Sequence, residues 1–194
     1  MLPRSFATAV LLLFATSAFA FDTVIIDPGH GGKDPGSMGI GGIMEKNLAL
    51  DLAKRMKKLF EEREIKVVLT RDGDTYPELA ERASFANKYT NSIFISLHFN
   101  GHPDTKVSGL ETFYMSPAGE RLANFVHDRL IRRMNTKNRG VKKGNLKVLR
   151  DTRCTAILIE GGFLTNRWEL QRCASGWYRE VLAKEIVAGV MRYR

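Results

Sequence analysis

Short apolar runs alternate with amphipathic segments along most of the chain. Four of these runs are rich in β-branched and aromatic residues and have the length of strands that are covered on both faces. A fifth segment alternates polar and apolar residues, as a half-buried strand does. The pattern therefore predicts strands at 23–26, 66–70, 92–97, 110–115 and 155–159.

The segments between these strands repeat their apolar residues at helical spacing. In the first of them Leu48, Leu52 and Met56 share one face, and basic residues occupy the other. We expect Pro77 in the first turn of the second helix and Ser116 as the N-cap of the third. The predicted helices are 45–62, 77–88, 117–134, 167–172 and 177–193. Strands that alternate with helices indicate an α/β fold, with a mainly parallel twisted sheet flanked by helices on both faces.

Three polar side chains stand where predicted strands end. His30 follows the strand 23–26 within Asp-Pro-Gly-His-Gly-Gly, a segment in which proline fixes φ and the glycines let the backbone turn sharply. His98 and Glu160 come directly after the strands 92–97 and 155–159. In parallel sheets the chemistry collects at the carboxyl edge, so we expect these three side chains to converge there.

Imidazole and carboxylate ligands together suit zinc, which keeps an open position when it has three protein ligands. Glu45 opens a predicted helix and is a candidate third ligand, although the helix dipole alone favours a glutamate there. A turn residue bonded to backbone is an equally simple interpretation of His30, as is a core imidazole for His98, and no compact metal motif decides between them. We expect His102 and His127, in a polar loop and a charged helix, on the surface.

The first 20 residues combine an early arginine, an apolar block and small residues before position 21. This pattern predicts a Sec-type signal peptide that is cleaved after Ala20, leaving one domain at 21–194. The apolar block falls short of the roughly 20 residues that a membrane span needs, so no stable membrane anchor is expected after cleavage.

The chain carries a formal net charge of +9. It lacks the basic, aromatic-interleaved repeats of nucleic-acid binders, and an exported protein is not expected to bind nucleic acid. An anionic wall polymer is the better partner, although lysine and arginine also simply solubilise a surface. The two cysteines, Cys154 and Cys173, are open to either interpretation, as a disulfide or as unpaired thiols.

Six sequence blocks occur in an order that resembles the zinc-dependent N-acetylmuramoyl-L-alanine amidases of the Amidase_3 type. They are DPGHGGKDPG, the glycine-rich run into Met44-Glu45-Lys46, LTRDGD, ISLHFNG, NRGVKKGNLKVLR and ILIEGGFLTN. The resemblance extends over 23–193 and implies an α/β sandwich around a largely parallel sheet. By position it implies one Zn²⁺ per chain, with His30, Glu45 and His98 as ligands and Glu160 as the acidic catalytic residue.

The resemblance implies an exported monomeric hydrolase that cleaves the amide between N-acetylmuramic acid and L-alanine in peptidoglycan. The expected location is the periplasm, with secretion or attachment to the cell wall as the alternative. A related zinc exopeptidase acting on free peptides and a wall-binding module without turnover are the competing interpretations. Chelation and product analysis would separate the three.

Several residues near the resembling blocks bear on the substrate groove. We expect Asn100, Arg139, Lys142 and Lys143 to border it, although a solvated basic loop explains the last three equally well. Many family members have alanine where this chain has Phe99, and we expect that ring to alter the pocket wall.

Only ten residues, 99–108, separate His98 from Gly109. A helix needs about 12 residues to be marginally stable alone, so this segment is too short to carry a helix that covers the site. We therefore expect an open zinc site that requires no activator protein.

Overall fold

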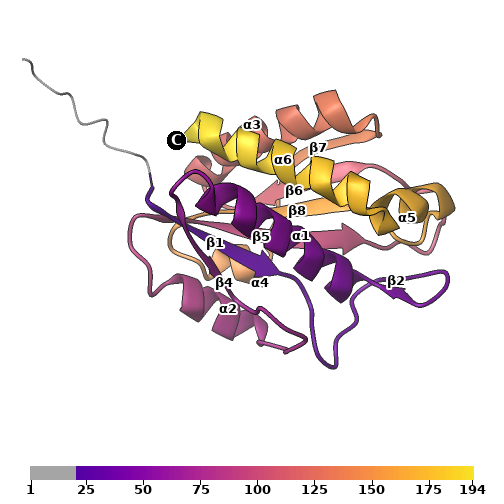
Figure 1. Cartoon of the computed structure of the whole chain (residues 1–194), viewed down its shortest axis with the longest axis horizontal. Helices are drawn as coiled ribbons and strands as arrows, with labels where there is room; N and C mark the ends of the chain where they lie inside the picture. The colour runs from indigo at the N-terminus through magenta and orange to yellow at the C-terminus, as the bar shows by residue number, and fades with distance from the viewer. Residues whose placement is uncertain (1–20) are drawn as a thin grey trace, which may run out of the picture.

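A computed structural model describes residues 21–194, so the expected signal peptide at 1–20 lies outside the described residues and stays a prediction. Six strands form one mixed sheet in the order β4-β1-β5-β8-β6-β7 (Figure 1). Their bounds are β1 Thr23–Pro28, β4 Lys66–Leu69, β5 Ser92–Asn100, β6 Leu110–Tyr114, β7 Asn138–Lys143 and β8 Thr155–Phe163. Strands β4, β1, β5 and β8 are parallel, whereas β6 pairs with β8 antiparallel and with β7 in parallel. The predicted α/β fold with a mainly parallel sheet is confirmed.

Helices cover both faces of this sheet, also as predicted (Figure 1). On one face lie α1 Glu45–Glu61, α3 Pro117–Met134, α5 Arg167–Ala174 and α6 Gly176–Tyr193; on the other lie α2 Leu79–Ala86 and α4 Lys147–Arg150. A hydrophobic core lies on each face of the sheet, and successive residues of β1 pack into different ones. Val24 and Ile26 belong to the larger core under the long helices, and Ile25 belongs to the smaller core. This is why the run 23–26 reads as continuously apolar.

Strands β5 and β8 extend beyond the apolar runs that predicted them. Their parallel register continues through the pair of His98 with Glu160 and reaches Asn100. His98 and Glu160 therefore lie within strands and not after them. Their backbone is fixed by the sheet ladder, which gives the two side chains a more rigid base than a loop would.

Some element boundaries differ from the predicted ones. Pro77 is not in the first turn of α2, because Glu78 is the N-cap and forms a reciprocal capping box with Glu81. Ser116 does cap α3, where its Oγ accepts a hydrogen bond from the backbone N–H of Gly119, 3.1 Å away. Strand β7 and helix α4, together with the small hairpin of β2 Met38–Gly39 and β3 Ile43–Met44, were not predicted.

Neither cysteine forms a disulfide in the described chain. Cys173 is a buried residue of α5, and Cys154 is half-buried directly before β8, each as a free thiol. Within residues 21–194, no helix combines the length and apolar character needed to cross a membrane.

Candidate metal centre

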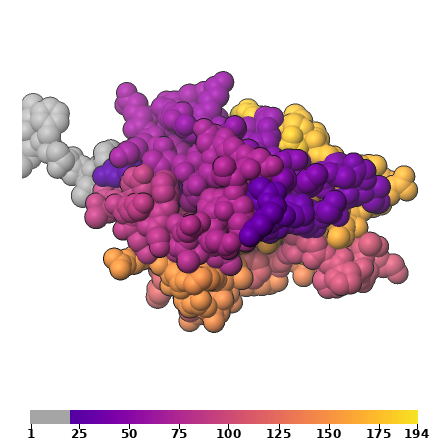
Figure 2. Space-filling view, turned by 90° about the horizontal axis from the view of Figure 1, so that it is seen from below, coloured from indigo at the N-terminus to yellow at the C-terminus, as the bar shows by residue number. Residues whose placement is uncertain are grey.

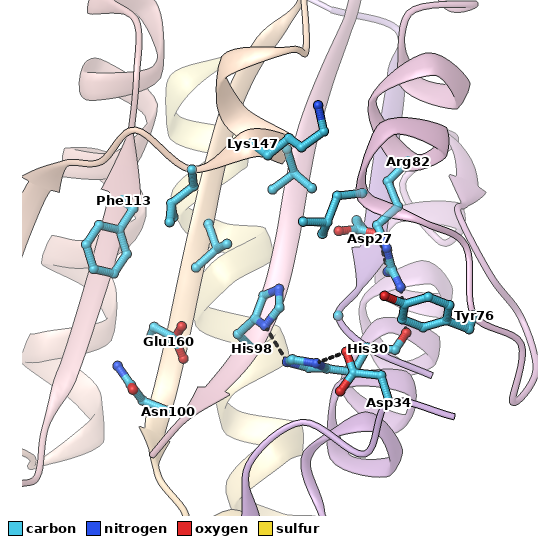
Figure 3. Close-up of a pocket in the computed structure, with 15 residues that line it drawn as sticks. Asp27, His30, Asp34, Tyr76, Arg82, His98, Asn100, Phe113, Lys147 and Glu160 are labelled. Carbon is cyan, nitrogen blue, oxygen red and sulfur yellow. Dashed lines mark hydrogen bonds and ion pairs between the residues drawn. The ribbon is translucent and has the colours of Figure 1, made fainter. Parts of the chain in front are cut away.

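Parallel pairing of β1 with β5 brings the two predicted histidines to the same edge of the sheet. Pro28 lies beside Leu97, so the turn after β1 places His30 against His98. Nδ1 of His98 is 3.1 Å from Nε2 of His30 and 2.9 Å from Oε1 of Glu45. Nε2 of His30 is also 2.9 Å from that carboxylate oxygen. The two rings are nearly perpendicular, with an interplanar angle of 80°, and Figure 3 shows their nitrogens in contact.

The turn that carries His30 depends on close backbone approach. His30 itself has φ 59°, in the left-handed region that a non-glycine residue seldom adopts. A Cβ on Gly29 would lie 2.3 Å from Cε1 of His98, and one on Gly36 would lie 2.5 Å from Oε2 of Glu45. Side chains at either position would therefore displace the proposed ligands.

Two arginines that sequence analysis did not single out donate hydrogen bonds to the backbone carbonyls of this turn. Nε of Arg71 donates to the carbonyl of Pro28 at 3.0 Å, and its Nη2 donates to that of Gly29 at 2.8 Å. Arg82 donates to the carbonyls of Pro28 and His30 at 2.8 and 2.6 Å. The only sequence signal for Arg71 was its place in the LTRDGD block, and Arg82 had none.

Asp27 completes this buried support. Its carboxylate pairs with Nη1 of Arg82 at 2.8 Å, and both side chains are almost fully buried. It also accepts hydrogen bonds from the hydroxyls of Thr70 and Ser96. A buried ion pair with this many partners is satisfied on both sides, so it fixes the position of the turn relative to β1.

The pKa values of the clustered side chains are shifted, because these ionisable groups are buried beside one another. Burial alone would lower the pKa of His98, but the hydrogen bond and charge of Glu45 outweigh it and raise that pKa to about 9. Burial alone would raise the pKa of Glu45, but hydrogen bonds from His30 and His98 lower it to about 2. Without a metal, this cluster therefore holds protons that a cation would replace.

The donor set fits a metal ion. The ligand atoms of His30, Glu45 and His98 all lie within 4.8 Å of one another. Two imidazoles and one carboxylate are the protein ligands of one class of catalytic zinc site. Nδ1 of His30 lies 2.7 Å from Oδ2 of Asp34, the type of outer carboxylate that orients a ligating imidazole. Asp34 was missed by sequence analysis, although it stands four residues after His30.

Glu160 lies next to this cluster on β8, beside His98 in the register. Its Oε2 is buried and has no hydrogen-bond partner among the described residues. Burial raises the pKa of this carboxyl to about 7, against the lowering effect of the His98 charge. An unpartnered buried carboxyl costs stability, so it is the kind of group that is retained for chemistry.

A pocket of about 400 Å³ opens over these residues on the face of α2 and α4. His30, Asp34, His98 and Glu160 line it, as Figure 3 shows. Its walls are mostly apolar or aromatic and include Tyr76, Leu79, Phe113, Leu146, Val148 and Leu158.

The residues expected to border a groove are placed differently from one another. Asn100 lines the pocket, and its Nδ2 donates to Oε1 of Glu111 at 2.7 Å. Arg139 and Lys142 lie farther out and both pair with Oε2 of the same buried Glu111. Lys143 ends β7 and is exposed. The strand β7 replaces the solvated loop considered above, and contact of these basic residues with substrate stays a prediction.

Two sequence predictions near the site are wrong. Phe99 does not alter the pocket wall, because side chains alternate along β5 and its ring is buried in the core on the opposite face. His127 is not on the surface, because it lies on the inner side of α3, with Nε2 2.8 Å from Oδ1 of Asn138. His102 is exposed, as expected.

Comparison with known proteins gives one consistent family. The model of the family Amidase_3, N-acetylmuramoyl-L-alanine amidase, matches residues 24–192. An uncharacterized cell wall amidase of Bacillus anthracis is 37% identical over 188 residues, which cover 88% of this chain and 35% of that protein. The amidase LytC of Bacillus subtilis is 31% identical over 176 residues, which cover 89% of this chain and 35% of LytC. The chain thus spans about a third of the length of these two relatives.

Solved structures agree. The amidase AmiC2 of Nostoc punctiforme superposes with a TM-score of 0.85 at 37% identity, covering 90% of this chain and 97% of that one. The CwlD amidase of Clostridioides difficile, solved in complex with the GerS lipoprotein, gives a TM-score of 0.82 at 27% identity, covering 89% and 98%.

Proposed function

The chain belongs to the N-acetylmuramoyl-L-alanine amidase family Amidase_3, and we propose that it uses one Zn²⁺ to hydrolyse the amide between N-acetylmuramic acid and L-alanine in peptidoglycan. The observation that carries this proposal is the convergence of His30, Glu45 and His98 beside the unpartnered carboxyl of Glu160. These residues come from four different segments of the chain, and they meet at the carboxyl edge of the sheet.

His30, Glu45 and His98 would hold the metal. Zinc at such a site lowers the pKa of a bound water to about 7 and polarises the carbonyl of the scissile amide. Asp34 keeps the ring of His30 oriented through Nδ1, which leaves Nε2 facing the other two ligands. The hydrogen bonds from Arg71 and Arg82 hold the backbone that carries this ring.

Glu160 acts as the general base and acid. With a pKa raised to about 7 it is partly ionised at neutral pH and can take a proton from the attacking water. The same carboxyl then delivers a proton to the nitrogen of the departing L-alanine, because a pKa near the working pH suits both transfers. Its free Oε2 is the atom available for this role.

The surroundings of the site define where substrate lies. The apolar walls contributed by α2, α4 and β6 flank the pocket, so the polymer lies across the carboxyl edge, with the scissile amide over the metal ligands. Asn100 contacts substrate from within the pocket, and Arg139, Lys142 and Lys143 border the groove outside it. The enzyme is a monomer.

The proposal includes export. The first 20 residues have the pattern of a signal peptide, and the basic mature domain at 21–194 suits an anionic wall. We place the enzyme in the periplasm, with secretion or attachment to the wall as the alternative.

Product analysis tests this function. The purified protein is incubated with sacculi and, separately, with free stem peptides. The proposal predicts new L-alanine amino termini and lactyl carboxyls from sacculi. Trimmed free peptides without sacculus cleavage would instead identify an exopeptidase, and binding without any product would identify a wall-binding module. A chelated sample with zinc restored serves as the control for metal dependence.

A further inference from the structure

Exposed apolar side chains gather at one end of the molecule, away from the pocket. The structure describes six large hydrophobic residues as exposed, and four of them form what we call the apolar patch. These are Met38, Ile40, Trp168 and Trp177, which are 56%, 72%, 74% and 72% exposed. Such a concentration of exposed apolar surface marks a site of contact with something other than water.

The patch is built from the β2–β3 hairpin and the helices α5 and α6. A Cβ on Gly39 would lie 2.3 Å from Leu170, so the hairpin lies directly on α5. Two shallow depressions of about 550 and 310 Å³ meet along α5, and both are lined by Gln171 and Ser175. Ile40 borders the first depression and both tryptophans border the second. Ile40 and the two tryptophans therefore belong to one surface, and Met38 lies two residues before Ile40 on the same hairpin.

The hairpin projects from the body of the protein. Its residues 37–44, Ser-Met-Gly-Ile-Gly-Gly-Ile-Met, include no charged side chain, although 26% of the chain is charged. A Cβ at Gly41 or Gly42 would have no neighbouring atom within 4 Å, so the tip is surrounded by open space. Figure 2 shows the indigo segment reaching the same end of the molecule as the yellow-orange helices. The tip therefore presents Ile40 as a protruding apolar residue.

The rim of the patch is positively charged. Arg167 is exposed on α5 and Arg172 is half-buried there, whereas Arg179 on α6 is paired with Asp51. The one acidic residue in 167–179 is Glu169, which is buried and accepts hydrogen bonds from the backbone N–H groups of Gly109 and Phe163. A second copy of this chain would bring the same positive rim, so charge disfavours self-association.

We propose that the apolar patch binds the surface of an anionic phospholipid bilayer. Tryptophan favours the level of the lipid headgroups, and an apolar tip beside it enters the boundary with the acyl chains. Arginines on the rim pair with anionic headgroups while their stems lie on apolar surface. The protruding tip of Ile40, Gly41, Gly42 and Ile43 offers no hydrogen-bonding side chain to a glycan, whereas it suits the apolar boundary of a bilayer.

This binding is peripheral and uses a different face of the protein from the one on which the pocket opens. The pocket opens on the face of α2 and α4, whereas α5 and the hairpin lie on the side of the long helices (Figure 1). A protein seated on a membrane through the patch would therefore keep its pocket open to polymer above the bilayer. The consequence is an enzyme held near the innermost layer of the wall.

Intrinsic fluorescence tests the proposal directly, because the two tryptophans of the chain are both in the patch. The mature chain starting at Phe21, which contains the whole described fold, is titrated with phosphatidylglycerol vesicles and with phosphatidylcholine vesicles. We expect emission to shift to shorter wavelength and to resist acrylamide quenching with the anionic vesicles. High salt should reverse the shift, because the Debye length falls to about 3 Å at 1 M.

Substitutions test whether the apolar patch is the part of the protein that binds the vesicles. Ile40→Asp leaves both reporters in place and should weaken binding about tenfold or more, because an apolar side chain no longer leaves water. Arg167→Gln should weaken it about fivefold. Trp168→Ala should weaken it while Trp177 still reports. Phe125→Asp, at an exposed apolar position on α3 outside the patch, is the matched control and should bind as the unmodified chain does.

Several results would overturn the proposal. Anionic vesicles that leave the emission unchanged would do so, as would Ile40→Asp binding as tightly as the unmodified chain. A shift caused by peptide-free glycan strands and not by vesicles would assign the patch to the wall polymer. A shift that depends on protein concentration without vesicles would assign it to self-association.

Discussion

At the scale of single residues, the histidines and the glutamate of the site shift one another's pKa values. His98 and Glu45 hold pKa values of about 9 and about 2 because they are hydrogen-bonded to each other away from water. Neither value can be read from the sequence, since the partners are 53 residues apart. The residues themselves were proposed from their places in the blocks that resemble the family, because each position taken alone also has a simple structural interpretation.

Zinc binding should release protons at pH 7. In the metal-free protein the raised pKa of His98 keeps its imidazole protonated until the pH approaches about 9, and a ligating imidazole must be neutral. Affinity should therefore rise with pH up to about 9. Calorimetry at pH 7 in buffers of different ionisation enthalpy measures the release. A binding enthalpy that is the same in every buffer would mean that no proton is displaced.

The same shifts make the metal-free protein sensitive to pH. Because the folded pKa of His98 is raised, its contribution to stability is complete below the unfolded value of 6.5 and is lost as pH rises through about 9. Glu45 acts in the opposite direction, and its contribution is lost as pH falls from 4.5 through about 2. Urea unfolding of the chelated protein should show stability declining between pH 6.5 and 9. Constant stability over that range would contradict the His98–Glu45 pairing.

Glu160→Gln should separate chemistry from metal binding. The amide cannot accept the proton, so turnover should fall at least about 100-fold, while His30, Glu45 and His98 retain zinc. Metal content and rate are measured on the same preparation, with Glu62→Gln at an exposed position as the control. If Glu160→Gln lost its zinc, this residue would be a ligand and the division of roles would be wrong.

Residues that position the proposed ligands without binding the metal themselves were harder to predict from the sequence. Asp34, Arg71 and Arg82 touch the ligand turn only because β1, β4 and α2 fold against one another. The orientation of a side chain on its element was equally hidden, which is why Phe99 and His127 were misplaced. Charged neighbours of His127 suggested solvent, but the inner side of α3 decides its burial.

At the scale of elements, apolar runs predicted the buried strands, but they did not predict the edge strand β7. Strand β7 consists of Asn-Arg-Gly-Val-Lys-Lys and lies at the end of the sheet, where one side of the backbone is unpaired and polar side chains are tolerated. Strands β5 and β8 were predicted too short, because their apolar runs are interrupted by the polar residues His98 and Glu160.

The link between β1 and α2 provides a test at this scale. Arg82→Met leaves the Asp27 carboxylate buried without its cation and should lower the free energy of unfolding by about 3–5 kcal/mol. Arg132→Met removes an exposed partner of Asp128 on α3 and should cost at most about 1 kcal/mol. Urea denaturation of the zinc-loaded proteins compares them. Equal losses in the two variants would show that the buried pair does not hold the turn.

At the scale of the whole molecule, the layers and the shared direction of β4, β1, β5 and β8 followed from the sequence. The order of alternating elements predicted helices on both faces and a common edge for the site. It did not predict that β6 and β7 run against the other strands, because direction at the edge depends on connections that carry no local signal. The projecting hairpin was also missed, since its strands are only two residues long each.

No element closes over the site in the part of the chain that the structure describes. The segment between Asn100 and Leu110 contains no helix, in agreement with its length. The pocket thus remains open at the carboxyl edge, and the account predicts hydrolysis without an activator protein.

Turnover of sacculi by the isolated 21–194 chain tests this central claim most directly. The chain is loaded with zinc, checked for folding and metal content, and supplied with no other protein. The account predicts that new L-alanine amino termini accumulate with time and that chelation stops them. A folded and zinc-loaded chain that stays silent on sacculi until a second protein is added would contradict it.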